Sequence, residues 1–421
     1  MKRLAVFTGG QMVGHLQEND RYELVFSYTP QWLAKQDAFA LSPNLPLSEQ
    51  ALTGDNVTAF FENLLPEGEV LTFISKAAHI SQSNIFGLLE RFGGDTAGAF
   101  SILPEGMEPT GEPHYLPVTP ESIKAWFERS RGIPLDISGE QARMSLSGAQ
   151  DKMTVFMDDQ GNLSIPLGAA PSSHIVKPSI QHRQDIPHTA INEALVMTLA
   201  ERIGMKVAQV RYAPELEAII IARYDRTVGS DGRLNRRHQN DLCQILGIPS
   251  CKKYEVEGGP SLKTCFEAVL TRSSQPALDK KRLIEWVIFN ALVGNMDGHA
   301  KNLSLMTQGN QRTQLAPFYD LVCTAVYPNL SQKLAFKIGG ENRPKWLMPR
   351  HWQRFAEDIS IKPKFIDKAM ADMIRQIETE LPRVVLEIKG LVSKPEELQM
   401  IEKVANQINI SIGLIKSRIK S

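Results

Sequence analysis

Cysteines are scarce in this chain, and long apolar runs are missing. Its 421 residues include 4 cysteines, which form no C-x-x-C pair and have no histidine partners at zinc spacing: Cys243, Cys251, Cys265 and Cys323. This spacing argues against a disulfide framework and against a structural metal, so we expect reduced, buried thiols. No apolar run reaches the roughly 18 residues of a membrane helix, and the apolar run after Met1 is too short for a signal peptide. We therefore expect a cytoplasmic protein without membrane contact.

An excess of charge of either sign is also missing. The chain has 47 Lys and Arg against 47 Asp and Glu, so no global field steers it to nucleic acid. With 42% hydrophobic and 22% charged residues the composition is that of an ordinary globular protein. At this length we expect two or three domains rather than a single core.

Two carboxylates and an amide are spaced as in the catalytic loop of a kinase. Asp297 and Asn302 have the same separation as two residues of the kinase catalytic loop. In a kinase, the aspartate accepts the substrate hydroxyl proton and the asparagine holds a metal ion. Asp320 follows after two short strand-like runs, so it can return beside the loop as a second metal ligand. Magnesium prefers oxygen ligands and keeps several waters, so two or three side-chain oxygens suffice. The pattern predicts a phosphoryl-transfer site that uses Mg²⁺.

Each of these fragments also has a purely structural interpretation. An Asp-Gly followed by Asn is typical of a turn, and the Phe-Tyr-Asp at 318–320 is typical of a strand end. The groups nevertheless occur in kinase order, after an amphipathic helix expected at residues 283–293 that delivers Asp297 to a loop. We therefore favour phosphoryl transfer.

A loop and a lysine at a strand end could bind the phosphates of a nucleotide. Backbone N–H groups of the loop at residues 143–152 can point at one anion, although a plain hairpin loop is the simpler explanation because Gly148 is its only glycine. Lys177 ends an otherwise apolar strand at residues 173–178, as does the kinase lysine that pairs with nucleotide phosphates. A lysine that reaches solvent from a strand end is common. Its place after the loop and before a helix favours the phosphate role.

The segment after Lys177 has the order expected around a nucleotide. A helix expected at residues 189–203 carries Glu193, which can pair with Lys177, although a favourable charge near the helix amino end explains it equally well. A hairpin at residues 209–221 then leads into residues 222–226, Ala-Arg-Tyr-Asp-Arg, where a kinase hinge belongs. Adenine would lie there against apolar side chains, with Tyr224 available for stacking.

The strand and helix patterns divide the chain into three parts. Residues 1–134 begin with alternation at residues 4–6 and 22–28, typical of a β-meander, and continue with helices near residues 55–64 and 71–79. Residues 135–225 carry the nucleotide-binding strands, and residues 226–421 are mostly helical. A strand is expected at residues 333–338. A basic cluster is typical of a solvated face or of a contact with a partner: Arg233, Arg236, Arg237 and His238. We predict an α+β fold: a two-lobed kinase-like fold with a β-rich amino-terminal subdomain and a helical carboxy-terminal lobe.

Five blocks of sequence carry a resemblance to one family. They are Ser145-Leu-Ser-Gly-Ala-Gln-Asp-Lys152, His174-Ile-Val-Lys177, Asn240-Asp-Leu-Cys-Gln244 with Lys253-Tyr-Glu-Val-Glu-Gly-Gly-Pro260, Asp297-Gly-His-Ala-Lys-Asn302 and Phe318-Tyr-Asp320. The chain resembles the HipA-like serine/threonine kinase toxins of bacterial toxin–antitoxin systems over essentially its whole length. The resemblance implies Mg-ATP as cosubstrate, phosphorylation of a protein serine, and neutralisation by a small helix-turn-helix antitoxin that is HipB-like and binds DNA. By resemblance to the best-known members, the expected substrate is an aminoacyl-tRNA synthetase. Its phosphorylation would stall tRNA charging and halt growth, giving persistence.

The resemblance also implies roles for individual residues. Asp297 is expected to be the catalytic base, Asn302 and Asp320 the Mg²⁺ ligands, and Lys177 a contact to the α- and β-phosphates. Further nucleotide contacts are expected from Ser147, Gly148, Ala149, Gln150, Asp151 and Lys152 in the loop, and from Tyr224, His299 and Asn302. Ser145, or Ser147 in its place, is expected to be autophosphorylated.

This chain departs from the family pattern at two positions. The family hinge reads Glu-Arg-Phe-Asp-Arg, whereas residues 222–226 begin with alanine, so a glutamate near the nucleotide is missing. Ser147 also stands where the best-known member has alanine.

Two other functions explain parts of the sequence. A small-molecule kinase uses a similar Asp-x4-Asn loop, and a corepressor would bind a DNA-bound antitoxin, with DNA contact mainly through that antitoxin because the net charge is zero.

Overall fold

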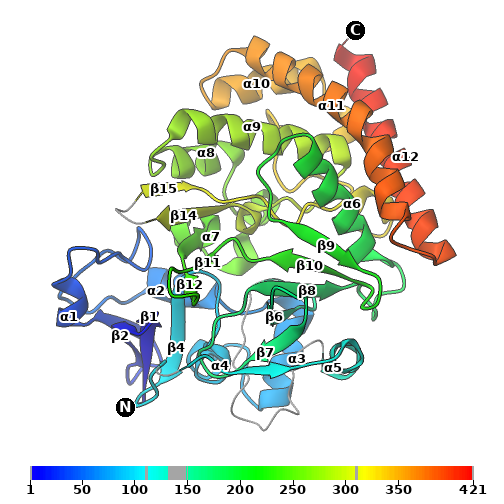
Figure 1. Cartoon of the computed structure of the whole chain (residues 1–421). Helices are drawn as coiled ribbons and strands as arrows, with labels where there is room; N and C mark the ends of the chain where they lie inside the picture. The colour runs from blue at the N-terminus through cyan, green and yellow to red at the C-terminus, as the bar shows by residue number, and fades with distance from the viewer. Residues whose placement is uncertain (1, 110–111, 131–147, 149, 309–311, 420–421) are drawn as a thin grey trace. The chain divides into compact units, whose positions relative to one another are not determined.

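The chain forms two compact units in a computed structural model that describes residues 2–109, 112–130, 148, 150–308 and 312–419 (Figure 1). Each unit is assembled from three stretches of sequence. The first unit takes Met1–Lys177, Ile221–Cys251 and Ser304–Thr313, and the second takes Pro178–Ile220, Lys252–Leu303 and Gln314–Ser421. The three-part division at residues 134 and 225 stays a prediction.

The first unit begins with an antiparallel sheet of order β3-β2-β1-β4. Its strands are β1 (Arg3–Thr8), β2 (Gln11–Glu18), β3 (Leu24–Tyr28) and β4 (Phe100–Pro104). The predicted meander is therefore confirmed. Gly14 in β2 faces β3 so closely that a Cβ atom would lie 2.4 Å from the Ser27 carbonyl oxygen, which explains a glycine inside a strand.

Four helices cover the apolar side chains of this sheet: α1 (Pro30–Leu33), α2 (Asp55–Glu62), α3 (Gly68–Ala78) and α4 (Ile85–Phe92). The sequence patterns predicted α2 and α3 but not α1 or α4. The core is aromatic, with Phe61 packed edge-on against Phe60 and tilted against Phe26 at ring-centroid distances of 5.1 and 5.9 Å. Such ring contacts add to the free energy gained by burial alone.

The other strands of the first unit carry the predicted nucleotide segments. Strands β5 (Tyr115–Pro117), β7 (Leu163–Pro166), β6 (Met153–Met157) and β8 (His174–Pro178) follow one another in a sheet, with α5 (Pro120–Ser130) after β5. The antiparallel register pairs Met153 with Val176, which are the sequence neighbours of Lys152 and Lys177. The remaining elements are β11 (Arg226–Val228), β12 (Leu234–Arg236), β13 (His238–Asp241), α7 (Leu242–Leu246), η1 (Ser250–Lys252), β14 (Ser304–Gln308) and β15 (Arg312–Leu315).

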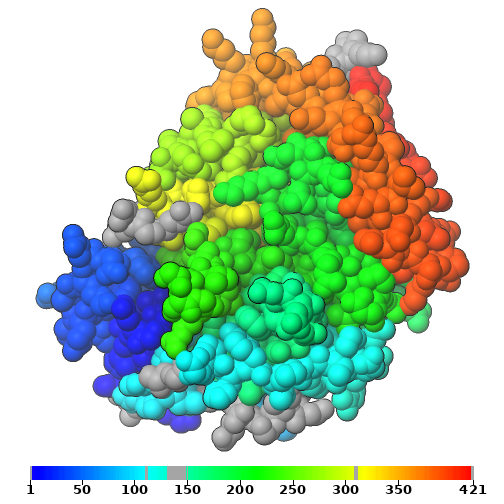
Figure 2. All heavy atoms as spheres, in the orientation of Figure 1, coloured from blue at the N-terminus to red at the C-terminus, as the bar shows by residue number. Residues whose placement is uncertain are grey.

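The second unit is mainly helical, as predicted for the carboxy-terminal part. Its elements are α6 (Thr189–Arg202), the neighbouring strands β9 (Val210–Ala213) and β10 (Ala218–Ala222), η2 (Glu255–Glu257), α8 (Leu262–Leu270), α9 (Pro276–Val293), η3 (Ala300–Asn302), η5 (Thr324–Val326), η6 (Pro344–Trp346), α10 (Pro349–Asp358), α11 (Pro363–Lys389) and α12 (Pro395–Ile419). Helices α11 and α12 pack on each other and on both α6 and α9. Their outer faces form the orange-to-red surface in Figure 2. Because α6 is covered by these helices, it is buried on most sides instead of along a single stripe.

Three smaller predictions were wrong in whole or in part. Residues 333–338 contain no strand, only an isolated bridge between Ile338 and Glu341. The basic cluster is a solvated face only in part: Arg233 is exposed, but His238 is buried and the Arg236 side chain is only 5% exposed. Cys251 is exposed, whereas the other three cysteines are buried as expected. In the described residues we find no helix with the length and apolarity needed to cross a bilayer.

Candidate active site

The loop that carries Asp297 begins where helix α9 is stopped. Gly294 follows the helix with a φ of 74°, a left-handed conformation that favours glycine. A Cβ atom at this position would lie 2.9 Å from the Ala325 Cβ atom. The Ala325 N–H donates to the Gly294 carbonyl at 3.0 Å, and the Met296 N–H donates to the Thr324 hydroxyl at 2.8 Å. The loop is therefore fixed to the segment that follows Asp320.

Asn295 joins three parts of the site through one buried side chain that is 1% exposed. Its amide nitrogen donates to the Asn290 side-chain oxygen of α9 at 2.8 Å and more weakly to the Asp320 carbonyl at 3.5 Å. Its amide oxygen accepts the Asp297 N–H at 3.0 Å. Asp320 therefore returns beside the loop, as the sequence predicted, although its role as a metal ligand stays a prediction.

Asn302 closes the loop from the other end. It lies at the end of η3, is buried, and donates from its amide nitrogen to the Asp297 carbonyl at 3.1 Å. The same carbonyl accepts the His299 N–H at 2.9 Å, so the backbone of Asp297 is held from both sides. Because the amide nitrogen of Asn302 donates to the backbone, its amide oxygen is the atom that could coordinate a cation.

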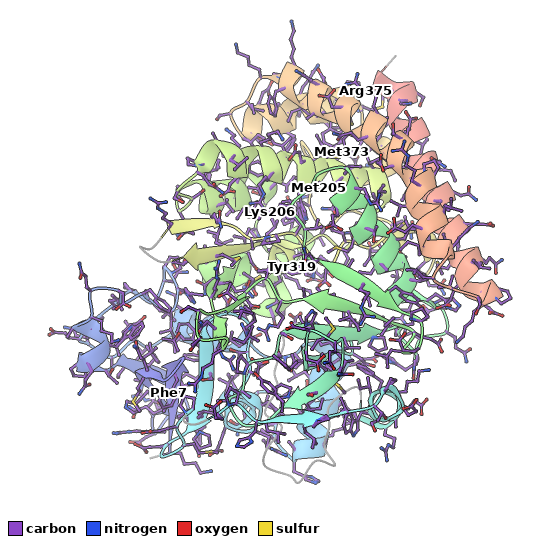
Figure 3. All side chains as sticks on the ribbon, in the orientation of Figure 1. Phe7, Met205, Lys206, Tyr319, Met373 and Arg375 are labelled. Carbon is purple, nitrogen blue, oxygen red and sulfur yellow. The ribbon has the colours of Figure 1, made fainter. Side chains whose placement is uncertain are left out.

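Asp320 has an unusual backbone conformation. Its φ of 55° is left-handed, which is uncommon for a residue other than glycine and recurs at functional sites. The preceding segment is fixed, because the Phe318 N–H donates to the Lys206 carbonyl at 2.9 Å and the Tyr319 hydroxyl donates to the Lys301 carbonyl at 2.6 Å. Lys206 and Tyr319 accordingly lie close together in Figure 3.

Asp297 itself is exposed, and its carboxylate is bonded to a residue from a different segment. The Tyr254 hydroxyl donates to Asp297 Oδ1. The Tyr254 ring lies edge-on to the buried His299 ring, with ring centroids 5.0 Å apart. Sequence reasoning missed both Tyr254 and Asn295. The available signals were that Tyr254 lies in the 253–260 block and that Asn295 opens the Asn-Met-Asp motif.

The predicted phosphate-binding residues lie in the first unit. Lys177 in β8 and Asp151 are buried, whereas Gln150 and Lys152 are half-buried. Gly148 has a φ of 121°, and its carbonyl accepts the Glu67 N–H at 3.0 Å. Ser145, Ser147 and Ala149 lie outside the described residues. Because Glu193 belongs to the second unit, its pairing with Lys177 stays a prediction.

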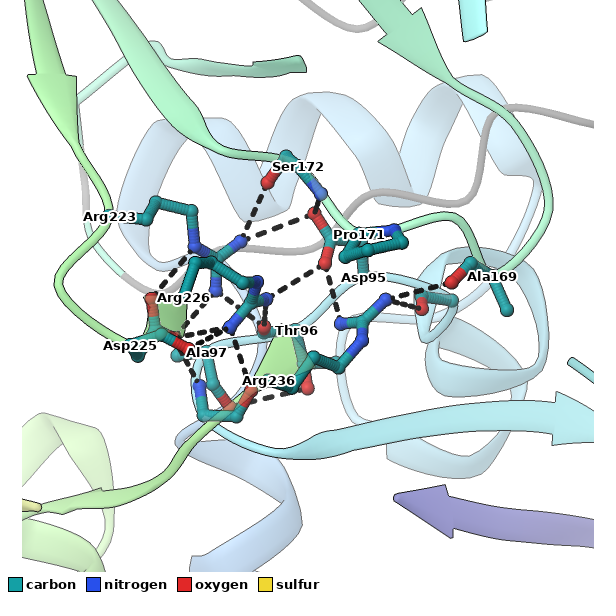
Figure 4. Close-up of polar contacts among 12 residues, drawn as sticks. Asp95, Thr96, Ala97, Ala169, Pro171, Ser172, Arg223, Asp225, Arg226 and Arg236 are labelled. Atoms are coloured by element: carbon teal, nitrogen blue, oxygen red, sulfur yellow. Dashed lines mark hydrogen bonds and ion pairs between the residues drawn. The ribbon is translucent and has the colours of Figure 1, made fainter. Parts of the chain in front are cut away.

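Residues 223–226 are held in a buried ionic network of the first unit (Figure 4). Arg223 and Arg226 bind both Asp225 and Asp95, and Arg236 binds Asp95 at 2.6 Å. Burial disfavours the charged carboxylates, but the arginines outweigh it: they hold the pKa of Asp95 well below its ordinary value and lower the pKa of Asp225 to about 2. Tyr224 between them is half-buried. The arginines of the predicted hinge therefore serve the packing of this unit.

The fold and the geometry of the Asp297 loop indicate the class of protein. A solved structure titled as the HipA, HipB and operator DNA complex of the Shewanella oneidensis toxin–antitoxin system matches the fold with a TM-score of 0.82 and 27% identity, covering 97% of this chain and 96% of that one. This match confirms the predicted α+β, kinase-like fold. The chain is thus a kinase with a sheet-rich amino-terminal region and a helical carboxy-terminal region.

The particular family follows from the sequence comparisons. The HipA-like C-terminal domain matches residues 144–381, and the HipA N-terminal domain matches residues 4–103. The serine/threonine-protein kinase toxin HipA of Shewanella oneidensis is 30% identical over 92% of this chain and 90% of its own length. Y4mE of Sinorhizobium fredii, named as a candidate kinase, is 35% identical over 92% of this chain and 93% of its own length. The chain belongs to the HipA-like serine/threonine kinases of toxin–antitoxin systems, as the resemblance predicted.

Proposed function

We propose that the chain transfers the γ-phosphate of ATP to a serine of a protein, with Asp297 as the catalytic base. The observation that carries this proposal is the Asn295 side chain, which is bonded to the backbone of both Asp297 and Asp320. These bonds bring the base and a predicted metal ligand to one place in the second unit. An aspartate in this role accepts the proton of the acceptor hydroxyl while phosphoryl transfer proceeds.

Asn302 and Asp320 would hold Mg²⁺ in this proposal. Their donor atoms fit a hard cation, because an amide oxygen and a carboxylate are the ligands that magnesium prefers and the remaining positions can be waters. When bound, the ion would neutralise charge on the phosphates. The left-handed backbone of Asp320 supports a functional role, since such conformations persist where the surrounding structure enforces them.

The nucleotide contacts are proposed residue by residue from the family resemblance. Lys177 would contact the α- and β-phosphates, and the 147–152 loop with Tyr224 and His299 would complete the nucleotide contacts. The β6–β8 register supports this role, because it pairs Met153 with Val176, the sequence neighbours of Lys152 and Lys177. Ammonium groups favour a polyanion over a neutral ligand.

The partners are proposed from the family. The matched solved structure is titled as a complex of HipA, HipB and operator DNA, so we propose a HipB-like helix-turn-helix antitoxin for this chain and DNA contact mainly through it. The substrate would be a protein serine, with an aminoacyl-tRNA synthetase as the first candidate, and phosphorylation would arrest growth or give persistence. Autophosphorylation of Ser145 or Ser147 would limit the activity. A cytoplasmic location completes the proposal, because the free cysteines stay reduced there.

Two substitutions test the catalytic assignment. Asp297→Asn and Asp320→Ala should each lower transfer from radiolabelled ATP by at least about 100-fold, because each removes a group that acts on the transition state. Both variants should keep the unfolding midpoint of the wild-type chain. Asp367→Asn on the exposed surface of α11 is the matched control and should keep full activity. Near-normal turnover in either site variant would contradict the assignment.

A phosphoproteome identifies the acceptor. Cells that briefly express the wild-type chain should gain phosphoserine on a small number of proteins that stay unmodified with Asp297→Asn. Phosphate found only on metabolites would instead indicate a small-molecule kinase.

A further inference from the structure

Tyr254 reaches the predicted base from outside the catalytic loop. It directly precedes η2, lies forty-three positions before Asp297, and is half-buried while its hydroxyl donates to Asp297 Oδ1. The Asp297 carboxylate is exposed, so solvent alone would leave its orientation free. The Tyr254 hydroxyl therefore gives the exposed Asp297 carboxylate a hydrogen-bond partner from another segment of the chain.

The segment that carries Tyr254 is fixed to the catalytic loop by its backbone as well. The Lys253 carbonyl accepts the Ala300 N–H at 3.2 Å. The residue before Tyr254 is therefore bonded to the loop that follows Asp297. The Tyr254 ring adds its edge-on contact with His299. Tyr254 is therefore held at three points: its neighbour's carbonyl, its ring and its hydroxyl.

A tight turn keeps this segment in place. The Gly259 N–H donates to the Tyr254 carbonyl at 3.0 Å, and a Cβ atom at Gly259 would lie 2.1 Å from the Lys252 carbonyl oxygen. Further along, the Lys337 N–H donates to a carboxylate oxygen of Glu255 at 2.7 Å. These contacts make the segment a rigid support, because a tyrosine has only two side-chain torsions to fix once its backbone is held.

The hydrogen bonds of Asp297 divide between its backbone and its side chain. Asn295, Asn302 and His299 fix the backbone of Asp297, but none of these bonds sets the torsions of its carboxylate. The Tyr254 hydroxyl does set them, because it binds Oδ1 directly. A carboxylate has about four acceptor positions, so Oδ2 keeps the capacity to accept another proton.

We propose that Tyr254 is a positioning residue that orients the Asp297 carboxylate for proton abstraction from the acceptor hydroxyl. This role rests on the proposed function of Asp297. During transfer the acceptor oxygen forms its bond to the γ-phosphorus, the bond from that phosphorus to the ADP oxygen breaks, and the acceptor proton moves to Asp297. Tyr254 keeps its own proton throughout and acts only through the orientation of the base.

The test separates orientation from nucleotide binding and from folding. Tyr254→Phe removes the hydroxyl and keeps the ring against His299. We expect kcat for phosphate transfer from ATP to dephosphorylated casein to fall about 10-fold with KM for ATP unchanged, because misorientation of a reacting group affects the chemical step. Tyr115→Phe is the matched control: Tyr115 is equally half-buried, its hydroxyl donates to the Pro171 carbonyl at 3.0 Å, and its ring stacks on Phe156. This control should keep the wild-type kcat.

A double-mutant cycle decides whether Tyr254 acts through Asp297. In single-turnover measurements, Tyr254→Phe should have no further effect on the residual rate of Asp297→Asn, since no base remains to be oriented. A wild-type kcat in Tyr254→Phe, a change confined to KM, or an equal additional loss in the Asp297→Asn background would each overturn the proposal. Full activity in Asp297→Asn would instead contradict the proposed function itself, which makes the two failures distinguishable.

Discussion

The carboxylate of Asp95 binds the guanidinium of Arg226, 131 positions further along the chain, at 2.9 Å. Both side chains are almost completely buried, at 2% and 1% exposure. Asp95 belongs to the part matched by the HipA N-terminal domain, and Arg226 belongs to the part matched by the HipA-like C-terminal domain. The first unit is therefore held together across the two family domains by buried charge, and not by apolar contacts alone.

Removal of the Asp95 charge should destabilise the first unit strongly. Asp95→Asn leaves Arg226 and Arg236 buried without a carboxylate that both of them bind, and breaking a buried pair costs about 3 to 5 kcal/mol. Denaturant unfolding measures this loss. The control is Glu112→Gln, which breaks the exposed pair with Arg233 and should cost less than about 1 kcal/mol. Equal losses for both variants would contradict a special role of the buried network.

The buried His238 should make the protein less stable in mild acid. Its ring contacts the rings of both Phe39 and Phe100, at centroid distances of 4.8 and 5.0 Å, and burial lowers its pKa to about 4. Above the unfolded pKa of about 6.5 the ring is neutral in both states and has no effect. As the pH falls from there to about 4, only the unfolded chain gains the proton, so up to about 3 kcal/mol of stability is lost.

Unfolding free energies at several pH values test this loss. In His238→Asn the decline between pH 6.5 and 4 should be shallower than in the wild-type chain. His114 is exposed, so His114→Asn should leave the decline as it is. The contribution of Asp225 is lost at lower pH, because its folded pKa is about 2, and the two effects are therefore separable. An unchanged decline in His238→Asn would show that another group causes it.

Asn295 should matter more for catalysis than its effect on stability suggests. Asn295→Ala removes the bonds to Asn290, to the Asp297 N–H and to the Asp320 carbonyl, and we expect a loss of about 100-fold in kcat together with about 1 to 3 kcal/mol of stability. Asn63 is an equally buried asparagine of the first unit that binds the Ala59 and Ile248 carbonyls. Asn63→Ala should cost similar stability and leave kcat near normal. A proportional loss of activity in both variants would reduce the role of Asn295 to folding.

Autophosphorylation should occur at Ser145, or at Ser147 if that serine has taken over the role. A phosphate adds about −1.5 to −2 charge, which repels the triphosphate, so the modified chain should bind ATP more weakly and lose activity. Mass spectrometry after incubation with Mg-ATP detects the modification, which should be absent in Asp297→Asn. An unmodified loop after long incubation of a demonstrably active chain would contradict this mechanism.

The sequence by itself determined the elements whose signal is local. Alternation predicted β1 and β3, and helical patterns predicted α2, α3 and α9. The spacing from Asp297 to Asn302 identified the loop that the structure shows closed by the Asn302 side chain. These signals are readable because side-chain periodicity and turn chemistry depend on near neighbours in the chain. The five motif blocks likewise identified the family that the comparisons confirm.

Only the tertiary structure decided which polar side chains are buried and what they bind. Arg236 and His238 looked like part of a solvated basic face, yet Arg236 binds Asp95 and His238 packs against two phenylalanine rings. Tyr254 and Asn295 gave no distinct pattern of their own, because their partners lie on other segments or are backbone groups. Burial and hydrogen bonding between distant segments depend on the packing of the whole chain, and the order of residues alone does not record that packing.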